Sequence, residues 1–440
     1  MISFRRIIQI TVPLIVGGLS MNIVNLTDTI FLGQLGAAEL GSAGNGSIFY
    51  FIFAYVGMGL TSGMQIIIAR RNGEKNYGEI NALLQSGILM ITVFAVFASS
   101  LILLGMDQLF SSIYRSATVA QGSYDYLSVR SYGLFFTLFN FAMTAFFVGI
   151  TKTRVISWVV PLAALLNILL DYLLIFGIAG FPELGIKGAA LASVISEATG
   201  ALLLLGVAVY RYRNSEFMLF RRVRNQIKFS QEIFKLSYPL LLQNFITLGA
   251  WFVFFSLIEK LGENELAASH IIRSIYGFLM LPSFSLADAT NSLVSNLIGE
   301  KKQDQIFHLI KRVIIIGLVF NIICIILNLG FEKQIFLLFT KDEAVIGAAG
   351  YAFTIINLAL VILTLAMVLF RSLTGTGMTK LSLVLEIISV FIYLTYAVIV
   401  SQSEQASINL FWSAEFIYFS LIAVLSYLFL RFGNWRSRAI

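Results

Sequence analysis

Long apolar stretches separated by short polar links run along the whole chain. Twelve of them are long enough to cross a membrane as helices, because a hydrocarbon core of about 30 Å needs about 20 apolar residues. They are 7–35, 47–69, 81–105, 127–150, 155–178, 186–210, 233–257, 274–297, 313–329, 349–370, 381–400 and 409–430. The pattern therefore predicts an all-α polytopic membrane protein with twelve transmembrane helices.

The two halves of the chain match each other in one register. Residues 4–76 can be set against residues 230–302 without gaps, and the same displacement holds much further along. The identities include Pro13 with Pro239, Gly149 with Gly375 and Thr153 with Thr379. Each unit has six spans, an even number, so the units are expected to be parallel repeats about an axis along the membrane normal, with a cavity between them. We predict an N-lobe at 1–210, a basic cytoplasmic linker at 211–232 and a C-lobe at 233–440.

Cations and acids divide between the two sides of the predicted membrane. With the N-terminus inside, the inner segments hold Arg70, Arg71, Lys75, Lys152, Arg154, Arg211, Arg213, Arg221, Arg222, Arg224, Lys228, Lys301, Lys302, Lys311, Arg312, Arg431, Arg436 and Arg438. The outer links hold acids: Glu39, Asp107, Glu183, Glu265 and Glu404. Because short cytoplasmic loops carry an excess of Lys and Arg, we expect a multi-pass protein of the cell (inner or plasma) membrane with both termini cytoplasmic.

Composition narrows the class of function. Hydrophobic residues make up 58% of the 440 residues and charged ones 12%, too few charges to cover a soluble domain of this length. The net charge of +7 gathers in the inner links, which favours contact with anionic lipids over nucleic acid. Cys324 alone forms no disulfide within the chain, and two histidines are too few for a metal cluster. The sequence shows no catalytic pair typical of a membrane-embedded enzyme, and a channel explains the duplication less well.

Carboxylates inside spans are the candidate chemistry, since each costs several kcal/mol and marks a functional site by default. Asp28 lies among Asn22, Asn25, Thr27 and Thr29 in the first span. Asp171 follows Asn167 by four residues, so both project from one helical face, as Ala189 and Ser193 do in the sixth span. Such oxygens suit a small hard cation, and desolvated carboxylates bind either Na⁺ or H⁺.

Four further acids lie within predicted spans. Asn25, Glu197 and Asp288 are secondary candidates for the cation site, and for the two acids a structural role is equally open. Glu386 and Glu415 are interpreted as structural, either near the bilayer edge or paired with cations such as Arg371 or Lys380.

Several motifs resemble the multidrug and toxin extrusion (MATE) family. Residues 167–177 (NILLDYLLIFG) and 182–193 (PELGIKGAALAS) are similar to its fifth and sixth helices. Pro13, Asp28 and 33–36 (GQLG) resemble its first helix, and 266–270 (LAASH) and 375–380 (GTGMTK) its second-half signatures. The resemblance covers nearly the whole chain. It implies two six-helix lobes around a V-shaped cleft, and export of drugs or metabolites driven by inward Na⁺ or H⁺.

The resemblance also implies the ligands of the coupling ion. The family's first-helix Asp, fifth-helix Asn and Asp, and sixth-helix Thr correspond to Asp28, Asn167, Asp171 and Ser193, with the carbonyl of Ala189 as a further ligand. Ser in place of Thr keeps the hydroxyl.

The second half departs from one bacterial branch of the family. That branch has a Glu in the seventh helix, where this chain has Thr247, and the tenth helix has no Asp between Tyr351 and Phe370. The chain therefore resembles the branch of DNA-damage-inducible proteins, in which the N-lobe carries the coupling.

We thus expect a cation-coupled antiporter that exports drugs, toxins or amphipathic, often cationic, metabolites by alternating access. No cofactor beyond Na⁺ or H⁺ is expected, and the fold needs no partner, so we expect a monomer. The alternative is a lipid-linked oligosaccharide flippase of the same superfamily, which would need a cationic cavity. The first-lobe core is interpreted as carrying acids rather than Arg or Lys, which favours neutral or cationic solutes.

Overall fold

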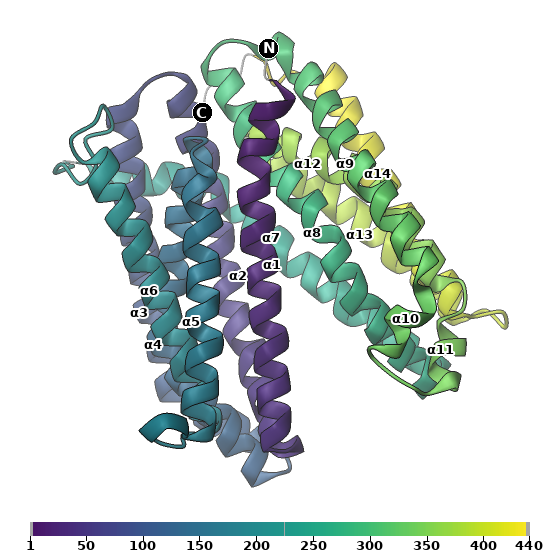
Figure 1. The fold of residues 1–440 in the computed structure, drawn as a ribbon. Coiled ribbons are helices and arrows are strands. Elements are labelled where there is room, and N and C mark those ends of the chain that lie inside the picture. Colours follow the sequence, from purple (N-terminus) through teal and green to yellow (C-terminus); the bar gives the residue numbers. More distant parts are fainter. Residues whose placement is uncertain (1–2, 224, 437–440) are drawn as a thin grey trace. The chain divides into compact units, whose positions relative to one another are not determined.

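The computed structural model describes residues 3–223 and 225–436, and within these ranges every regular element is helical (Figure 1). The long helices are α1 (Phe4–Leu35), α2 (Ala37–Gly73), α3 (Tyr77–Ile113), α4 (Ala117–Gly149), α5 (Ile156–Phe176), α6 (Ile186–Tyr212), α7 (Gln226–Ile258), α8 (Glu263–Gly299), α9 (Ile306–Gly330), α12 (Ala352–Gly375), α13 (Thr379–Ser401) and α14 (Ile408–Phe432). Two short helices, α10 (Glu332–Leu337) and α11 (Glu343–Ala349), join α9 to α12. The all-α prediction is confirmed.

Eleven of the long helices in the described ranges are apolar enough to cross a membrane by length and composition. The remaining one, α8, is 37 residues long but carries buried polar side chains such as Asn291 and Asn296. Neighbouring helices in a bundle can satisfy such buried polar groups. The length of α8 is therefore sufficient to cross a membrane, although its hydropathy alone does not identify it as a span.

The chain forms two compact units, residues 12–241 and residues 1–11 with 242–440. The chain crosses from one unit to the other within α1 and within α7. The predicted linker, 211–232, contains the end of α6 and the first residues of α7. Arg224 and Arg438, counted above among the inner cations, lie outside the described residues.

Equivalent elements of the two units recur at one displacement. The helices α2 and α8 both span 37 residues, and each follows a glycine with positive φ: 151° at Gly36 and 146° at Gly262. Lys75 and Lys301 end these helices with φ of 59° and 58°. The long helix α4 has no unbroken counterpart, because Gly350 and Tyr351 separate α11 from α12. The predicted register thus holds in three dimensions.

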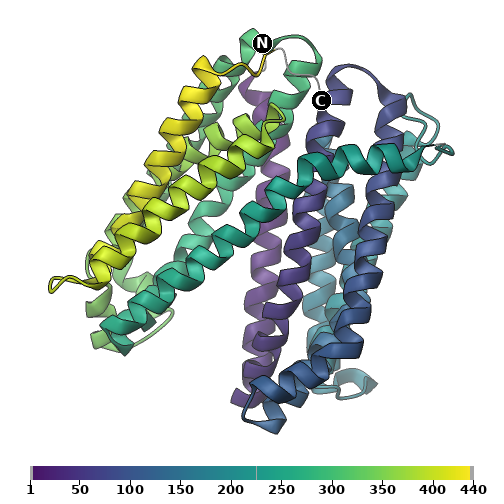
Figure 2. The same ribbon diagram turned by 180° about the vertical axis from the view of Figure 1, so that it is seen from behind.

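Small residues let the helices of the first unit pack closely, and α1 to α6 run side by side (Figure 1). A Cβ on Gly188 would lie 2.5 Å from the carbonyl oxygen of Leu174, which fixes α6 against α5. The first half of α7 crosses α2 and α3 (Figure 2). There the Ser237 hydroxyl donates to the carbonyl of Leu60 over 2.7 Å.

Candidate functional site

The two aspartates predicted to bind a cation meet inside the first unit. Asp28 projects from α1 and Asp171 from α5, and their carboxyl groups lie within hydrogen-bond reach of each other. Asp171 is fully buried, whereas Asp28 is partly buried. Among the described residues Oδ1 of each has no hydrogen-bond partner. Each aspartate of the pair therefore keeps one buried carboxyl oxygen without a hydrogen-bond partner.

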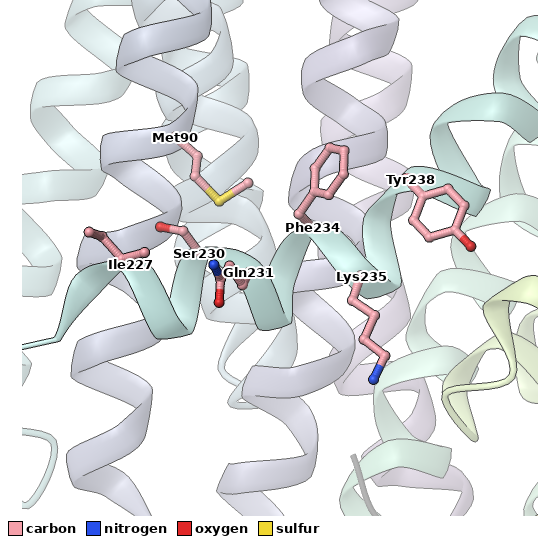
Figure 3. Close-up of a pocket in the computed structure, with 7 residues that line it drawn as sticks. All are labelled: Met90, Ile227, Ser230, Gln231, Phe234, Lys235 and Tyr238. Atoms are coloured by element: carbon pink, nitrogen blue, oxygen red, sulfur yellow. The ribbon is translucent and has the colours of Figure 1, made fainter.

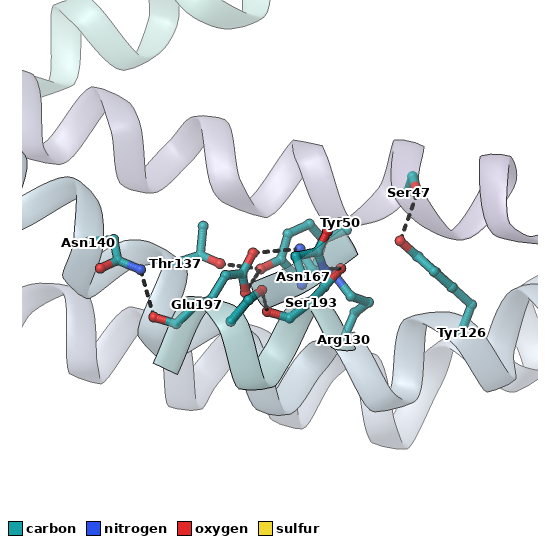
Figure 4. A network of polar contacts seen from close by, with 10 residues as sticks. Ser47, Tyr50, Tyr126, Arg130, Thr137, Asn140, Asn167, Ser193 and Glu197 are labelled. Atoms are coloured by element: carbon teal, nitrogen blue, oxygen red, sulfur yellow. Dashed lines mark hydrogen bonds and ion pairs between the residues drawn. The ribbon is translucent and has the colours of Figure 1, made fainter. Parts of the chain in front are cut away.

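Asn167 and Ser193 complete this cluster. Asn167 is 2% exposed, and its amide lies 3.5 Å from the Ser193 hydroxyl (Figure 4). With the amide turned over, its nitrogen donates to Oδ2 of Asp171 over 3.3 Å and its oxygen accepts from the Ser193 N–H over 3.2 Å. The second orientation satisfies more groups, and amide orientation is assigned from such networks. We name Asp28, Asn167, Asp171 and Ser193 the aspartate cluster.

The two remaining residues predicted for the cation site, Ala189 and Asn25, lie outside the aspartate cluster. Ala189 is buried one turn before Ser193, in an apolar group that includes Leu32 and Ile175. Asn25 is exposed one turn before Asp28, and no described contact joins it to the aspartate cluster.

A buried ion pair lies beside the aspartate cluster. Arg130 of α4 donates through Nη2 to Glu197 of α6 over 2.9 Å, and its guanidinium sits 3.9 Å from the centre of the Tyr50 ring (Figure 4). The Tyr50 hydroxyl donates to the other Glu197 oxygen over 3.5 Å. Arg130 also interacts electrostatically with both Asp28 and Asp171. Glu197 is therefore the anion of a buried ion pair one turn from Ser193.

Arg130 corrects the sequence interpretation, which placed acids but no Arg or Lys in the core of the first half. Its side chain is 7% exposed. The same rule that singled out the acids applies to a cation inside a span, and Arg130 falls within the predicted span 127–150. The sequence alone therefore indicated that Arg130 is a cation inside a membrane span.

Two predicted acids of the second unit are also placed differently. Glu386 and Glu415 are each 3% exposed, so protein encloses both side chains. Oε1 of Glu386 accepts from the hydroxyls of Thr247 and Tyr418, both over 2.8 Å. Arg371 pairs instead with Asp288, at 3.4 Å. These contacts fit the structural role expected for both glutamates: hydroxyl groups from other helices enclose them, and Arg371 also acts electrostatically on Glu386.

A shallow hollow lies elsewhere in the first unit, against the start of α7. It has a volume of about 500 Å³ and is lined by Met90, Ile227, Ser230, Gln231, Phe234, Lys235 and Tyr238 (Figure 3). Its lining is mostly apolar, with Lys235 at one side and no acid. It shares no residue with the aspartate cluster.

Together these features define a class of protein: a polytopic helical membrane protein built from two copies of one unit, with carboxylates buried among the helices. Within that class, a family model described as MatE matches residues 13–173 and again residues 239–399. These stretches make up more than half of the chain, which therefore belongs to the MatE family of multidrug and toxin extrusion proteins. Members of this family are transporters and not enzymes. The second match is displaced from the first by 226 residues, since 13 corresponds to 239 and 173 to 399. This displacement confirms the predicted internal repeat.

Similar proteins span the whole chain. A probable multidrug resistance protein NorM of Thermotoga maritima is 24% identical over 99% of this chain and 94% of its own length. A probable multidrug resistance protein YoeA of Bacillus subtilis is 22% identical over 99% and 95%. An outward-facing structure of a multidrug resistance MATE transporter superposes with a TM-score of 0.89, at 21% identity, over 99% of this chain and 97% of that one. A transporter of the MOP superfamily from Pyrococcus furiosus has a TM-score of 0.88, at 22% identity, over 97% and 95%.

Proposed function

We propose that the chain is a cation-coupled antiporter that exports small amphipathic solutes, and that Na⁺ or H⁺ binds at the aspartate cluster. The observation that carries the proposal is the meeting of Asp28 and Asp171, with an unpartnered oxygen on each. An amide and a hydroxyl, from Asn167 and Ser193, stand beside them. Oxygen ligands of this kind suit a small hard cation or a proton.

The cluster can couple an ion to movement because its carboxylates come from different helices. Two adjacent carboxylates repel each other when both are ionised. A bound cation or proton removes that repulsion and draws α1 toward α5. An ion drives a cycle only if it binds one conformation better than the other. We propose that the ion arriving from outside binds the conformation that disfavours the substrate, which is then released outward.

The names of the relatives support the class of substrate. The proteins from Thermotoga maritima and Bacillus subtilis are described as probable multidrug resistance proteins. Acids near the proposed ion site favour neutral or cationic amphipathic solutes. We further propose a monomer in the cell membrane with both termini cytoplasmic, in the branch that resembles DNA-damage-inducible proteins.

Transport into proteoliposomes tests this proposal, with a Na⁺ gradient and a pH gradient imposed separately against a panel of lipophilic cations. Asp28→Asn and Asp171→Asn should each abolish gradient-driven transport, because an amide neither carries the charge nor exchanges the proton. Asp107→Asn is the matched control, since Asp107 is exposed near the end of α3. Full transport by both cluster variants would refute the assignment of the ion site.

Arg130 is the one observation that favours the alternative, a lipid-linked oligosaccharide flippase, because a pyrophosphate needs a buried cation. Its Nη2 already pairs with Glu197, which neutralises that charge. Restoration of wall or capsule precursor export in a flippase-deficient strain would establish the alternative, and we expect no restoration.

A further inference from the structure

The second unit holds buried acids that the proposed coupling site does not use. Glu415 of α14 and Glu386 of α13 are each 3% exposed. A buried carboxylate is costly and needs a partner, an ion or a proton. Glu386 and Glu415 differ in how this cost is met.

Glu386 has partners that suit a permanent negative charge. Two hydroxyls donate to its Oε1, and Arg371 interacts with it electrostatically. Hydrogen bonds and a nearby cation both favour the ionised carboxylate. Glu386 therefore has hydrogen bonds and a cation that offset part of the cost of burying its charge.

Glu415 is enclosed differently. Its one described hydrogen bond is a long one, 3.3 Å from the Tyr276 hydroxyl. The described titratable and charged groups that act on it or on its neighbours are Tyr276 of α8, Arg371 of α12, Glu386 and Tyr393 of α13, and Tyr418 of α14. Of these, the only cation is Arg371, and it acts on Glu386. Glu415 thus lacks the charge compensation that Glu386 has.

A second, independent observation points into the same place. Tyr393 is 4% exposed and interacts electrostatically with Glu415, and its buried hydroxyl has no hydrogen-bond partner among the described residues. An unpartnered buried hydroxyl costs about 1–3 kcal/mol. A protonated carboxyl group can donate to the Tyr393 oxygen, whereas an ionised one can accept its O–H. The structure shows neither bond, so the Tyr393 hydroxyl can serve either protonation state of Glu415 only after a side-chain movement.

The position also corresponds to the aspartate cluster. The displacement of 226 residues carries Asp28 onto Phe254 and Asn167 onto Tyr393, and these two rings stack at 5.5 Å. Counted from the first residues of α6 and α14, Ile186 and Ile408, Ser193 corresponds to Glu415. The second unit thus has Phe254 and Ala397 where the first has Asp28 and Asp171, and it carries a carboxylate, Glu415, in place of the Ser193 hydroxyl.

We propose that Glu415 is a second proton-binding site, in which Tyr276 donates to the carboxyl group and the unpartnered Tyr393 hydroxyl lies close enough to interact with it electrostatically. The step is simple protonation: one proton from water adds to a Glu415 carboxylate oxygen and returns to water when it leaves. A metal cation fits less well, because the walls are the apolar rings of Phe254 and Trp412 rather than further oxygens. The proposal does not depend on coupling at the aspartate cluster.

Tryptophan fluorescence provides the test, because the Trp412 ring lies 6.1 Å from the Tyr276 ring. The full chain in lipid nanodiscs is titrated with acid. We expect a pH-dependent transition that Glu415→Gln and Trp412→Phe abolish, and that Asp171→Asn and Glu386→Gln leave in place. A transition that survives in Glu415→Gln overturns the proposal, as does the same fluorescence change on addition of Na⁺ at fixed pH.

An infrared measurement on the unmutated chain covers the case in which Glu415→Gln does not fold. Exposed carboxyl groups, with pKa about 4, stay ionised between about pH 8 and pH 6. In that interval we expect a protonated-carboxyl C=O band that shifts when glutamate is labelled with ¹³C. A chain without any glutamate-sensitive band there contradicts the assignment.

Discussion

In the first half of the chain the buried aspartates lie beside a buried cation, Arg130, whereas tyrosine hydroxyls surround the buried glutamates of the second half. Equivalent tyrosines serve both places: Tyr50 donates to Glu197 over 3.5 Å and Tyr276 to Glu415 over 3.3 Å. The first half therefore balances its acids with a fixed charge, and the second half mainly with hydrogen bonds. Duplication kept the helices and let the two sites diverge.

The stability of the two halves should therefore depend to different degrees on their charged side chains. Removing one partner of an ion pair in a protein interior is strongly destabilising, because the other charge is left buried without compensation. A hydroxyl partner leaves a smaller deficit when it is lost. Substitutions at equivalent places should therefore separate the two halves, and the three predictions below run from the largest effect to the smallest.

The largest effect is expected at the buried ion pair. Arg130→Gln leaves Glu197 without its cation and should lower the free energy of unfolding by about 3–5 kcal/mol. The comparison is Asp288→Asn, which breaks a pair that is 26% and 48% exposed and leaves Arg371 in place beside Glu386, so it should cost at most about 1 kcal/mol. Unfolding in mixed detergent micelles measures both.

Arg130→Gln combined with Glu197→Gln is the control, since it removes both charges and should recover most of the loss. If Arg130→Gln and Asp288→Asn cost the same, the contrast between the halves is wrong.

An intermediate effect is expected at the glycines that end α4 and α12. A Cβ on Gly375 would lie 2.5 Å from the Asn291 carbonyl oxygen, whereas one on Gly149 would lie 2.7 Å from the Cγ2 methyl group of Ile68. Side chains move more easily than backbone, so Gly375→Ala should cost about 2–3 kcal/mol and Gly149→Ala about 1 kcal/mol. The same unfolding assay ranks them, and the reverse order would show that the second half is the more adaptable one.

The smallest effect is expected at two equivalent helix caps. Ser116 caps α4 by accepting from the Val119 N–H over 3.3 Å, and Asp342 caps α11 by accepting from the Ala344 N–H over 2.9 Å. Ser116→Ala and Asp342→Ala should each cost about 1 kcal/mol. Hydrogen exchange should show the change spreading through all of the seven-residue α11 but staying in the first turn of α4. Equal spread in both helices would contradict this.

Much of the fold could be predicted because it depends on local pattern. Apolar runs gave the long helices, and the constant register gave the repeat that the structure and the family model confirm. Helix periodicity placed Asn167 and Asp171 on one face, and the family resemblance brought Asp28 to them, as the structure shows. The ion that binds them remains a prediction.

What could not be read from the sequence depends on contacts between distant helices. Arg130 and Glu197 are 67 residues apart, and no periodic pattern links them. Burial of Glu386 depends on Thr247 and Tyr418, which come from two other helices. Hydropathy describes each span alone, so it does not distinguish an acid facing hydroxyl groups from one at the bilayer edge.

The central claim, that Asp28 and Asp171 link ion movement to export, is tested most directly by comparing two rates in one proteoliposome preparation. One rate is gradient-driven accumulation of a lipophilic cation, and the other is its exchange across the membrane without any gradient. For Asp171→Asn we predict that accumulation falls at least about tenfold while exchange persists, because the substrate path remains but the bias between conformations is lost. Accumulation and exchange that stay at wild-type rates, or that fall together, would contradict the account.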